Sequence, residues 1–167
     1  MIKWLLLPAV VMMMAAGCIS TSVYVKDATQ MHQKRLAITD ISINIDRKPG
    51  KNAASDTICP CIAQSIRDIL TPYFQQAGFT VINIPAGSAM GYSDIKPLTD
   101  SMHIDYVFRG TGMVQITGGD YFLHQFSGKI VDLASLETPL TVTQAGTAFR
   151  VAKATGKMGA AILKKFR

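Results

Sequence analysis

The sequence predicts one α+β domain, and three observations carry that prediction. From Pro60 to Ala77, apolar residues recur at steps of three and four, which is the period of an amphipathic helix. Segments on both sides of this helix alternate apolar and polar residues, as strands do. Three long strand-like segments then follow one another through short turns, which favours an antiparallel meander. The expected order is β-α-β-α-β-β-β-α, with helices packed on a mainly antiparallel sheet.

Each element has its own local signal. The first strand is expected over Arg35–Ile45, and its alternation slips at Thr39-Asp40, which indicates a bulge. The helix from Pro60 ends before Gly78, a residue type common just after helix ends, and Pro72 is expected to kink it. The other expected strands are Phe79–Ile84, Ile104–Ile116, Tyr121–Leu133 and Leu140–Phe149, and the other expected helices are Ser93–Met102 and Val151–Phe166.

The first eighteen residues have the order of a bacterial secretory signal. Lys3 supplies a positive charge, an apolar run covers Leu5 to Met14, and Ala15-Ala16-Gly17 precedes Cys18. The apolar run is too short for a membrane span, which needs about 20 residues. The segment resembles the bacterial lipobox, with alanine three places before the cysteine where leucine is usual. The alternatives are a plain signal peptide cleaved after Gly17 and an anchor that is not cleaved.

The lipobox resemblance implies that Cys18 is the lipid attachment site, carrying acyl chains such as palmitate, and becomes the mature N-terminus. We therefore expect a signal peptide at residues 1–17, a lipidated tether at 18–34 and an α+β envelope domain at 35–167. The short alternation Val23-Tyr24-Val25 offers an alternative, an edge strand added to the domain. No aspartate follows Cys18, which in lipoproteins indicates outer-membrane sorting, with the domain facing the periplasm.

Composition and charge are ordinary for a globular protein. The chain is 49% hydrophobic and 17% charged, and its net charge is +6, or +5 once Lys3 leaves with the signal. The basic residues are scattered, with no run longer than two. Because an exported protein meets little nucleic acid, we expect membrane headgroups, cell-wall carboxylates or an acidic protein as its surroundings, and no nucleic-acid partner.

The Cys59-Pro60-Cys61 motif has three interpretations. A disulfide within the motif would be a local clip at the helix start, because so short a loop contributes only about 1.6 kcal/mol in the chain-entropy model. A redox or metal site would use thiols whose pKa is lowered by the helix N-terminus, although two cysteines supply only two ligands. The third interpretation is two plain thiols.

The remaining candidates for chemistry are few. His103 and Asp105 share a face if a strand begins there, so they are a candidate acid–base pair, and a surface histidine beside an acid is the simpler interpretation. His124 is expected on a sheet face. No nucleophile elbow, phosphate loop or zinc motif is present in the sequence. We therefore expect no catalytic residue, metal or cofactor, and no enzymatic activity.

Three short motifs, in order, carry a family resemblance. The first, Ile104 to Gly112 (IDYVFRGTG), is similar to a motif that leads into a long strand. The second, Gly128 to Glu137 (GKIVDLASLE), is similar to a motif of a strand and its turn. The third, Gly78 to Val81 (GFTV), is similar to a motif at a helix end. All three resemble the envelope fold of the curli-secretion lipoproteins, the lipoprotein activators of penicillin-binding proteins and the N-terminal domain of the Tol-system propeller protein. The resemblance implies this fold and an envelope location, and it implies no catalytic residue.

The sequence thus leads to three hypotheses. The first is a non-enzymatic, lipid-anchored envelope protein that binds another envelope protein in a secretion or cell-wall assembly. The second is a periplasmic thiol- or metal-handling protein that uses Cys59 and Cys61. The third is a subunit that forms a homo-oligomer through an exposed sheet edge. A pore is not expected, because the chain lacks room for the extra hairpins of the curli channel.

Overall fold

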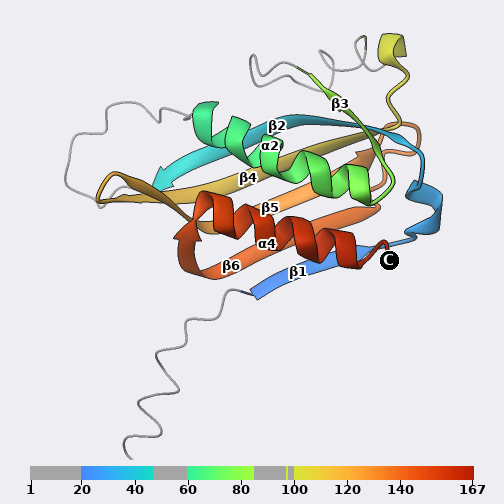
Figure 1. Ribbon diagram of the computed structural model, residues 1–167. Coiled ribbons are helices and arrows are strands. Elements are labelled where there is room, and N and C mark those ends of the chain that lie inside the picture. The colour runs from blue at the N-terminus through green and yellow to red at the C-terminus, as the bar shows by residue number, and fades with distance from the viewer. Residues whose placement is uncertain (1–19, 47–59, 85–96, 98–99) are drawn as a thin grey trace, which may run out of the picture.

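A computed structural model describes residues 20–46, 60–84, 97 and 100–167 of the chain. The strands form one six-stranded sheet in the order β1-β6-β5-β4-β2-β3 (Figure 1). The neighbours β1-β6, β6-β5 and β5-β4 pair antiparallel, whereas β4-β2 and β2-β3 pair parallel, so the sheet is mixed. The bounds of the strands are Ser20–Val25 (β1), Arg35–Asp46 (β2), Thr80–Asn83 (β3), Tyr106–Thr117 (β4), Asp120–Asp132 (β5) and Leu140–Arg150 (β6).

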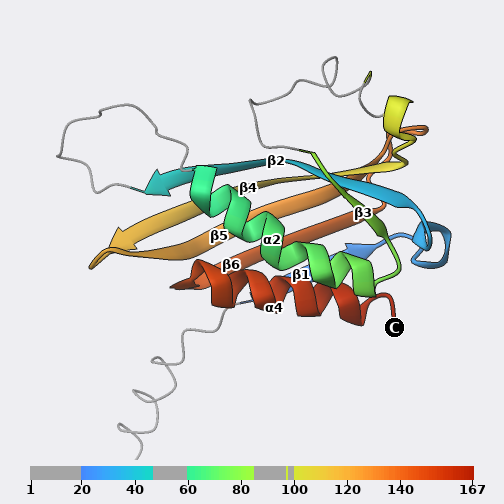
Figure 2. The ribbon, with the colours of Figure 1, turned by 45° about the horizontal axis from the view of Figure 1, so that its top comes forward.

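Two helices, α2 (Pro60–Gln76) and α4 (Val151–Lys164), lie side by side on one face of the sheet and run in the same direction (Figures 1 and 2). The main core lies between them and the sheet, and a second, smaller cluster is buried at one end of the sheet's other face, formed by Ala37, Ile84, Ile104 and Val107. Phe74 of α2 packs on Phe108 of β4 with ring centroids 5.2 Å apart, and Phe126 of β5 stacks on Phe108 from the other side at 6.5 Å. The α+β prediction is confirmed, since the amphipathic helices have one apolar face to bury and the sheet supplies the surface for it.

The expected bulge in the first strand is present. The register of β2 against β4 shifts between Ile38 and Ile41, at Thr39-Asp40. Because of this extra residue, the apolar runs on both sides of the slip face the helices. The buried Arg67 of α2 donates a hydrogen bond from Nη2 to the carbonyl oxygen of Thr39 at 2.8 Å, which ties the helix to the bulge.

The segment after Cys18 corrects one expectation. Residues 18–34 were expected to form an extended tether, yet residues 20–25 are strand β1, which pairs along its whole length with β6. Residues Thr29–Met31 then form a single 3-10 turn, η1, whose Met31 side chain is only 1% exposed. The alternative, an edge strand at Val23–Val25, describes the structure. The segment is mostly polar, so its sequence gives only a weak strand signal. Val23 is buried because β1 pairs with β6, and that pairing cannot be read from the segment itself.

The helix ends are set by local chemistry. Gly78 has φ +95°, and Phe79 N–H donates to the carbonyl of Phe74 at 3.1 Å, so the expected glycine stop of α2 is confirmed. α2 continues past Pro72, which lies on its exposed side. The helix expected over Ser93–Met102 falls mostly outside the described residues, and residues 100–102 are helical.

The two glycines of α4, Gly156 and Gly159, have different surroundings. A Cβ built on Gly159 would lie 2.2 Å from the Tyr73 ring of α2, far inside van der Waals contact, so the crossing of α2 and α4 requires a residue without a side chain there. A Cβ on Gly156 would lie 3.7 Å from the Tyr73 hydroxyl, an ordinary contact. One glycine is therefore needed by the packing, and the other is not.

We expect the substitutions Gly159→Ala and Gly156→Ala to have opposite effects on stability. Alanine gains roughly 0.5–1 kcal/mol over glycine inside a helix, and Gly156→Ala is expected to keep that gain. Gly159→Ala is expected to destabilise by about 1–3 kcal/mol, because the methyl group overpacks the interface with Tyr73. Urea unfolding of both variants measures the difference. Stabilisation by Gly159→Ala would contradict the close packing of the two helices.

Candidate binding surface

The cysteines predicted as chemical sites are only partly described. Cys18 and Cys59 lie outside the described residues. Cys61 stands exposed in the first turn of α2 and is disulfide-bonded. The pairing of Cys59 with Cys61 stays a prediction. A sulfur in a disulfide carries no thiolate, so Cys61 in this state offers no strong ligand to a metal ion.

Asp105 has a structural role in the described fold. One carboxylate oxygen accepts a hydrogen bond from the backbone N–H of Arg35 at 2.8 Å, and the other lies 3.8 Å from Lys34 Nζ. The backbone of Asp105 also bonds to Arg35 and to Leu133, so this residue joins the starts of β2 and β4 to the end of β5. His103 is exposed, with φ +50°, in the turn before β4. These contacts give Asp105 a structural role that accounts for a carboxylate at this position without proton transfer.

His124 lies in β5 and is half-buried, on a sheet face as expected. Its Nε2 lies 2.7 Å from Oε1 of Gln115 on β4, a cross-strand contact. Within the described ranges, no group of three or more His, Cys, Asp or Glu side chains is placed to hold a metal ion.

The face of the sheet opposite the helices carries a continuous row of hydroxyl side chains, which we call the hydroxyl row. It crosses five strands, because each member is the direct register partner of the next. Its members are Ser22, Thr143, Ser127, Thr111 and Ser42. All are exposed except the half-buried Ser42. Since neighbouring strands lie about 4.8 Å apart, the row presents a hydroxyl group at that spacing across the sheet.

Two further rows flank the hydroxyl row on this face. On one side lie Tyr24, Thr141, Lys129 and Arg109, and on the other lie Ser20, Ala145, Gln125, Met113 and Asn44. Alternation along each strand places all of them away from the helices. The surface is therefore polar with a basic side, and single apolar residues, Tyr24 and Met113, interrupt it at 61% and 40% exposure.

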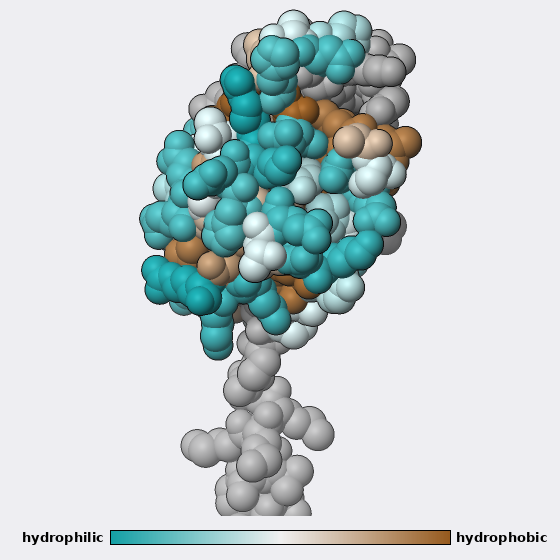
Figure 3. Space-filling view, turned by 90° about the vertical axis from the view of Figure 1, so that its right-hand side faces the viewer, coloured by the Kyte–Doolittle hydropathy of each residue, from teal (hydrophilic) through white to brown (hydrophobic). Residues whose placement is uncertain are grey.

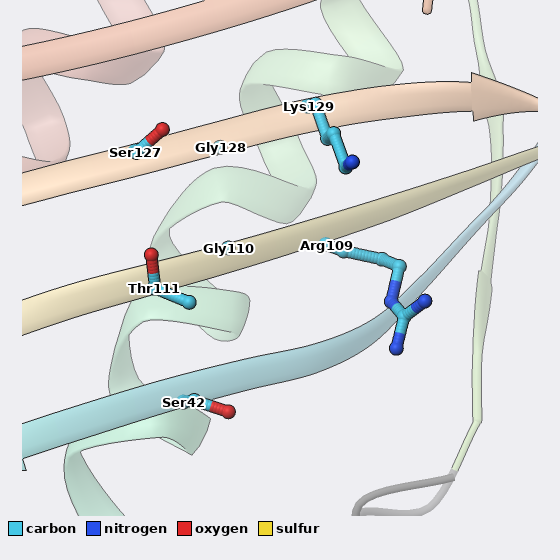
Figure 4. Close-up of a pocket in the computed structure, with 7 residues that line it drawn as sticks. All are labelled: Ser42, Arg109, Gly110, Thr111, Ser127, Gly128 and Lys129. Carbon is cyan, nitrogen blue, oxygen red and sulfur yellow. The ribbon is translucent and has the colours of Figure 1, made fainter. Parts of the chain in front are cut away.

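A shallow hollow of about 420 Å³ lies over the hydroxyl row. Ser42, Thr111 and Ser127 line it from three strands, Arg109 and Lys129 form its basic side, and α2 passes behind the sheet (Figure 4). A neighbouring hollow of about 160 Å³ shares Thr111 and Ser127 with it.

Glycines close to this surface serve the core on the other face. A Cβ on Gly110 would lie 2.5 Å from the Phe126 ring, and one on Gly128 would lie 2.6 Å from the Phe108 ring. In both cases the nearest ring atom is Cζ, so the ends of the rings occupy the space that a side chain would take. The aromatic residues of β4 and β5 form two groups: Phe108, Phe126 and Tyr106 are buried, whereas Tyr121 is 38% exposed and Phe122 is half-buried.

A third hollow of about 300 Å³ lies at the end of the sheet where β4 begins, between the end of β1, η1 and the turn after β5. Lys26 Nζ donates to a Glu137 carboxylate oxygen at 2.7 Å, and this hydrogen bond raises the pKa of Lys26 above its usual range. Burial, followed by the charges of Asp132 and Asp105, raises the pKa of Tyr106. The ion pair of Lys26 and Glu137 thus links the end of β1 to the turn after β5.

The open face suits contact with a large partner. Enclosed pockets hold small ligands by burying most of their surface, and the hollows here are shallow depressions on a broad polar surface. Sequence reasoning found the polar side of each strand but not the hydroxyl row, because its members come from five separate segments and only the strand register aligns them.

No family model matches the sequence, and no curated protein sequence matches it. Among solved structures, the PelC dodecamer from Paraburkholderia phytofirmans matches 89% of this chain and 94% of its own, with 13% identity and a TM-score of 0.53. This match shows a shared fold. Lipoprotein GNA1162 from Neisseria meningitidis matches 78% of this chain and 94% of its own, with 14% identity and a TM-score of 0.35. The LpoB C-terminal domain from Salmonella enterica matches 84% of this chain and 91% of its own, with 13% identity and a TM-score of 0.32.

We expect Asp105→Ala to destabilise the fold by about 1 kcal/mol, because it removes the acceptor for the Arg35 N–H, which water replaces only in part. The matched change His103→Asn is expected to stay within about 0.5 kcal/mol of the unmodified protein, since the side chain is exposed and asparagine tolerates positive φ. Urea unfolding measures both. Equal effects of the two changes would contradict the structural role assigned to Asp105.

Proposed function

We propose that this chain is a non-enzymatic lipoprotein of the bacterial envelope that binds another envelope protein through the open face of its sheet. Cys18 carries the lipid, the anchor lies in the outer membrane, and the domain faces the periplasm as part of a secretion or cell-wall assembly. The observation that carries the proposal is the exposed part of this face around the hydroxyl row, because within the described residues both long helices pack on the opposite face and the buried cluster of Ala37 and Val107 covers only one end.

The position of β1 supports the anchor. Ser20 begins β1 only two residues after Cys18, so a lipid there would hold the sheet itself at the membrane, with no long tether. Two or three acyl chains anchor a protein almost irreversibly, since each buried CH₂ contributes about 0.8 kcal/mol. Among the described residues, no helix has the length and apolarity to cross a bilayer.

The chemistry of the open face supports a protein partner. A broad surface with many hydrogen-bonding side chains and a few exposed apolar anchors has the composition of a reversible protein interface. Tyr24 and Met113 are such anchors at the two sides of the hydroxyl row, and Lys129 adds a positive charge suited to an acidic partner. Residues for catalysis are not part of this proposal.

Self-association is a second candidate function, and one observation favours it. β1 is an edge strand: it pairs with β6 on one side, and no described strand pairs with its other side. An edge strand offers unpaired backbone groups to a neighbouring chain. The PelC structure that shares the fold is a dodecamer, which supports the same possibility for this chain.

The anchor has a direct test. We expect Cys18→Ser to abolish labelling with radioactive palmitate and to move the protein from the membrane fraction to the soluble periplasmic fraction, because the only lipid-bearing atom is lost. Ser20→Ala is the matched control and should leave both unchanged. A Cys18→Ser protein that still fractionates with the outer membrane would refute the lipid anchor.

The binding surface is tested by crosslinking in intact cells. A photocrosslinking residue at position 127, in the hydroxyl row, is expected to form an adduct with a second envelope protein. The same residue at position 160, exposed on α4, is the control and should not. An adduct of twice the protein's own mass would favour self-association, and adducts formed only from position 160 would overturn the choice of face.

A further inference from the structure

The hairpin of β4 and β5 extends beyond Ser20 at the start of β1, the end of that strand that is nearer to Cys18 in the sequence. Ser20 aligns with Ala145, Gln125 and Met113 in one row across the sheet. β4 then continues for four more residues, from Met113 to Thr117, before it turns back. At 3.3 Å per residue, the hairpin reaches about 13 Å beyond this row.

The link from Ser20 to Cys18 is shorter than that reach. Two residues span at most about 7 Å, whatever path they take. A lipid on Cys18 therefore holds Ser20 within about 7 Å of the lipidated residue. The hairpin projects about 13 Å past the row of Ser20, which is farther than this link can reach. The end of the hairpin then lies at the level of the lipid headgroups.

The side chains at this end fit such a position. Ile116 and Tyr121 face each other directly across the hairpin and are 44% and 38% exposed. Directly opposed residues project from the same face of the ladder, so the two form one exposed apolar pair. Gly118 and Gly119 make the turn with positive φ and add no side chain that would keep the pair from a surface.

Two lysines lie beside this apolar pair. Phe149, at the end of β6, is the register partner of Leu123 and is half-buried. Lys153 and Lys157, in the first turns of α4, hold their Nζ atoms 4.8 and 4.5 Å from the centre of the Phe149 ring. Both side chains are exposed. Their stems cover apolar surface while the amines stay available to phosphate groups.

The acidic groups at this end only partly offset the basic ones. Asp120, in the hairpin, accepts a hydrogen bond from Arg150 at 2.7 Å, which neutralises that pair. Asp46, at the end of β2, is the other described carboxylate there. Lys153 and Lys157 outnumber it, so the local balance favours a negatively charged surface.

We infer that the β4–β5 hairpin is a second membrane contact, which inserts Ile116 and Tyr121 among the headgroups of a bilayer while Lys153 and Lys157 bind its anionic lipids. The inference rests on the proposed lipid at Cys18. Tyrosine is enriched at this depth because its ring is apolar and its hydroxyl is polar, and each lysine near an anionic surface adds to the attraction. Together the lipid and the hairpin fix the orientation of the domain.

The opposite end of the molecule has a different character. Figure 3 looks onto that end, where hydrophilic residues cover most of the surface and hydrophobic residues show only in smaller areas. A domain held by the lipid and the hairpin would turn this hydrophilic end towards the periplasm. The open sheet face would then stand at a steep angle to the membrane, accessible from the side.

The test uses tryptophan fluorescence of the lipidated protein in vesicles. The only tryptophan of the sequence, Trp4, lies in the predicted signal, so a single new tryptophan reports on one place. Ile116→Trp and Tyr121→Trp probe the hairpin, and Tyr24→Trp is the matched control near the other end of β1. In vesicles of phosphatidylethanolamine and phosphatidylglycerol, we expect a blue shift for both hairpin variants and loss of their emission on lipids brominated in the acyl chains. Tyr24→Trp should show neither.

The charge is tested in the Tyr121→Trp background. The double change Lys153→Gln/Lys157→Gln is expected to reduce the quenching on vesicles that contain phosphatidylglycerol. Lys164→Gln/Lys165→Gln removes the same charge at the other end of α4 and should not reduce it. Equal quenching in the two variants would overturn the role of anionic lipids.

Flotation of the same vesicles separates the two proposals. If the protein floats but the tryptophans at positions 116, 121 and 24 behave alike, the hairpin contact is wrong and the lipid anchor stands. If the protein carries no acyl chain and does not float, the proposed function fails and the hairpin contact fails with it. Urea unfolding identifies a variant that misfolds. If one hairpin variant misfolds, the other still tests the contact.

Discussion

The packing of α2 and α4 against a single face of the sheet is the constraint on which the rest of this structure depends. The two helices approach closely because Gly159 lets the Tyr73 ring rest on the backbone of α4. Beneath them, Phe74, Phe108 and Phe126 fill the space over strands that carry glycine where the rings lie. With both helices on this face, the other face of the sheet is open over the hydroxyl row, whereas Ala37 and Val107 near one end of that face are buried.

That asymmetry explains the character of the two faces. Alternation along each strand sends apolar residues to the helices and polar residues away from them, so the open face collects hydroxyl and amide groups. β-branched threonine suits this position, because it favours strands and tolerates water. The hydroxyl row is thus partly a consequence of a half-buried sheet. The proposed binding rests on its basic side and on the exposed apolar residues Tyr24 and Met113 beside it.

The N-terminal strand links the fold to its proposed location. Because β1 is part of the sheet and begins two positions after Cys18 in the sequence, a lipid on Cys18 would hold the sheet close to the membrane. A long tether would allow any face to meet a partner at many heights above the membrane. A short link would limit the height of the sheet above the bilayer, and the proposed hairpin contact would set its orientation.

The sequence by itself determined the α+β class, the bulge at Thr39-Asp40, the glycine stop at Gly78 and the prediction for Cys18. These depend on local periodicity, backbone preference and a short motif, which neighbours in sequence suffice to express. Tertiary structure decided that residues 20–25 join the sheet, that Gly159 is required by Tyr73, and that hydroxyl groups from five strands align. These depend on strand register and helix crossing, which bring together residues far apart in sequence and leave no local signal in the chain.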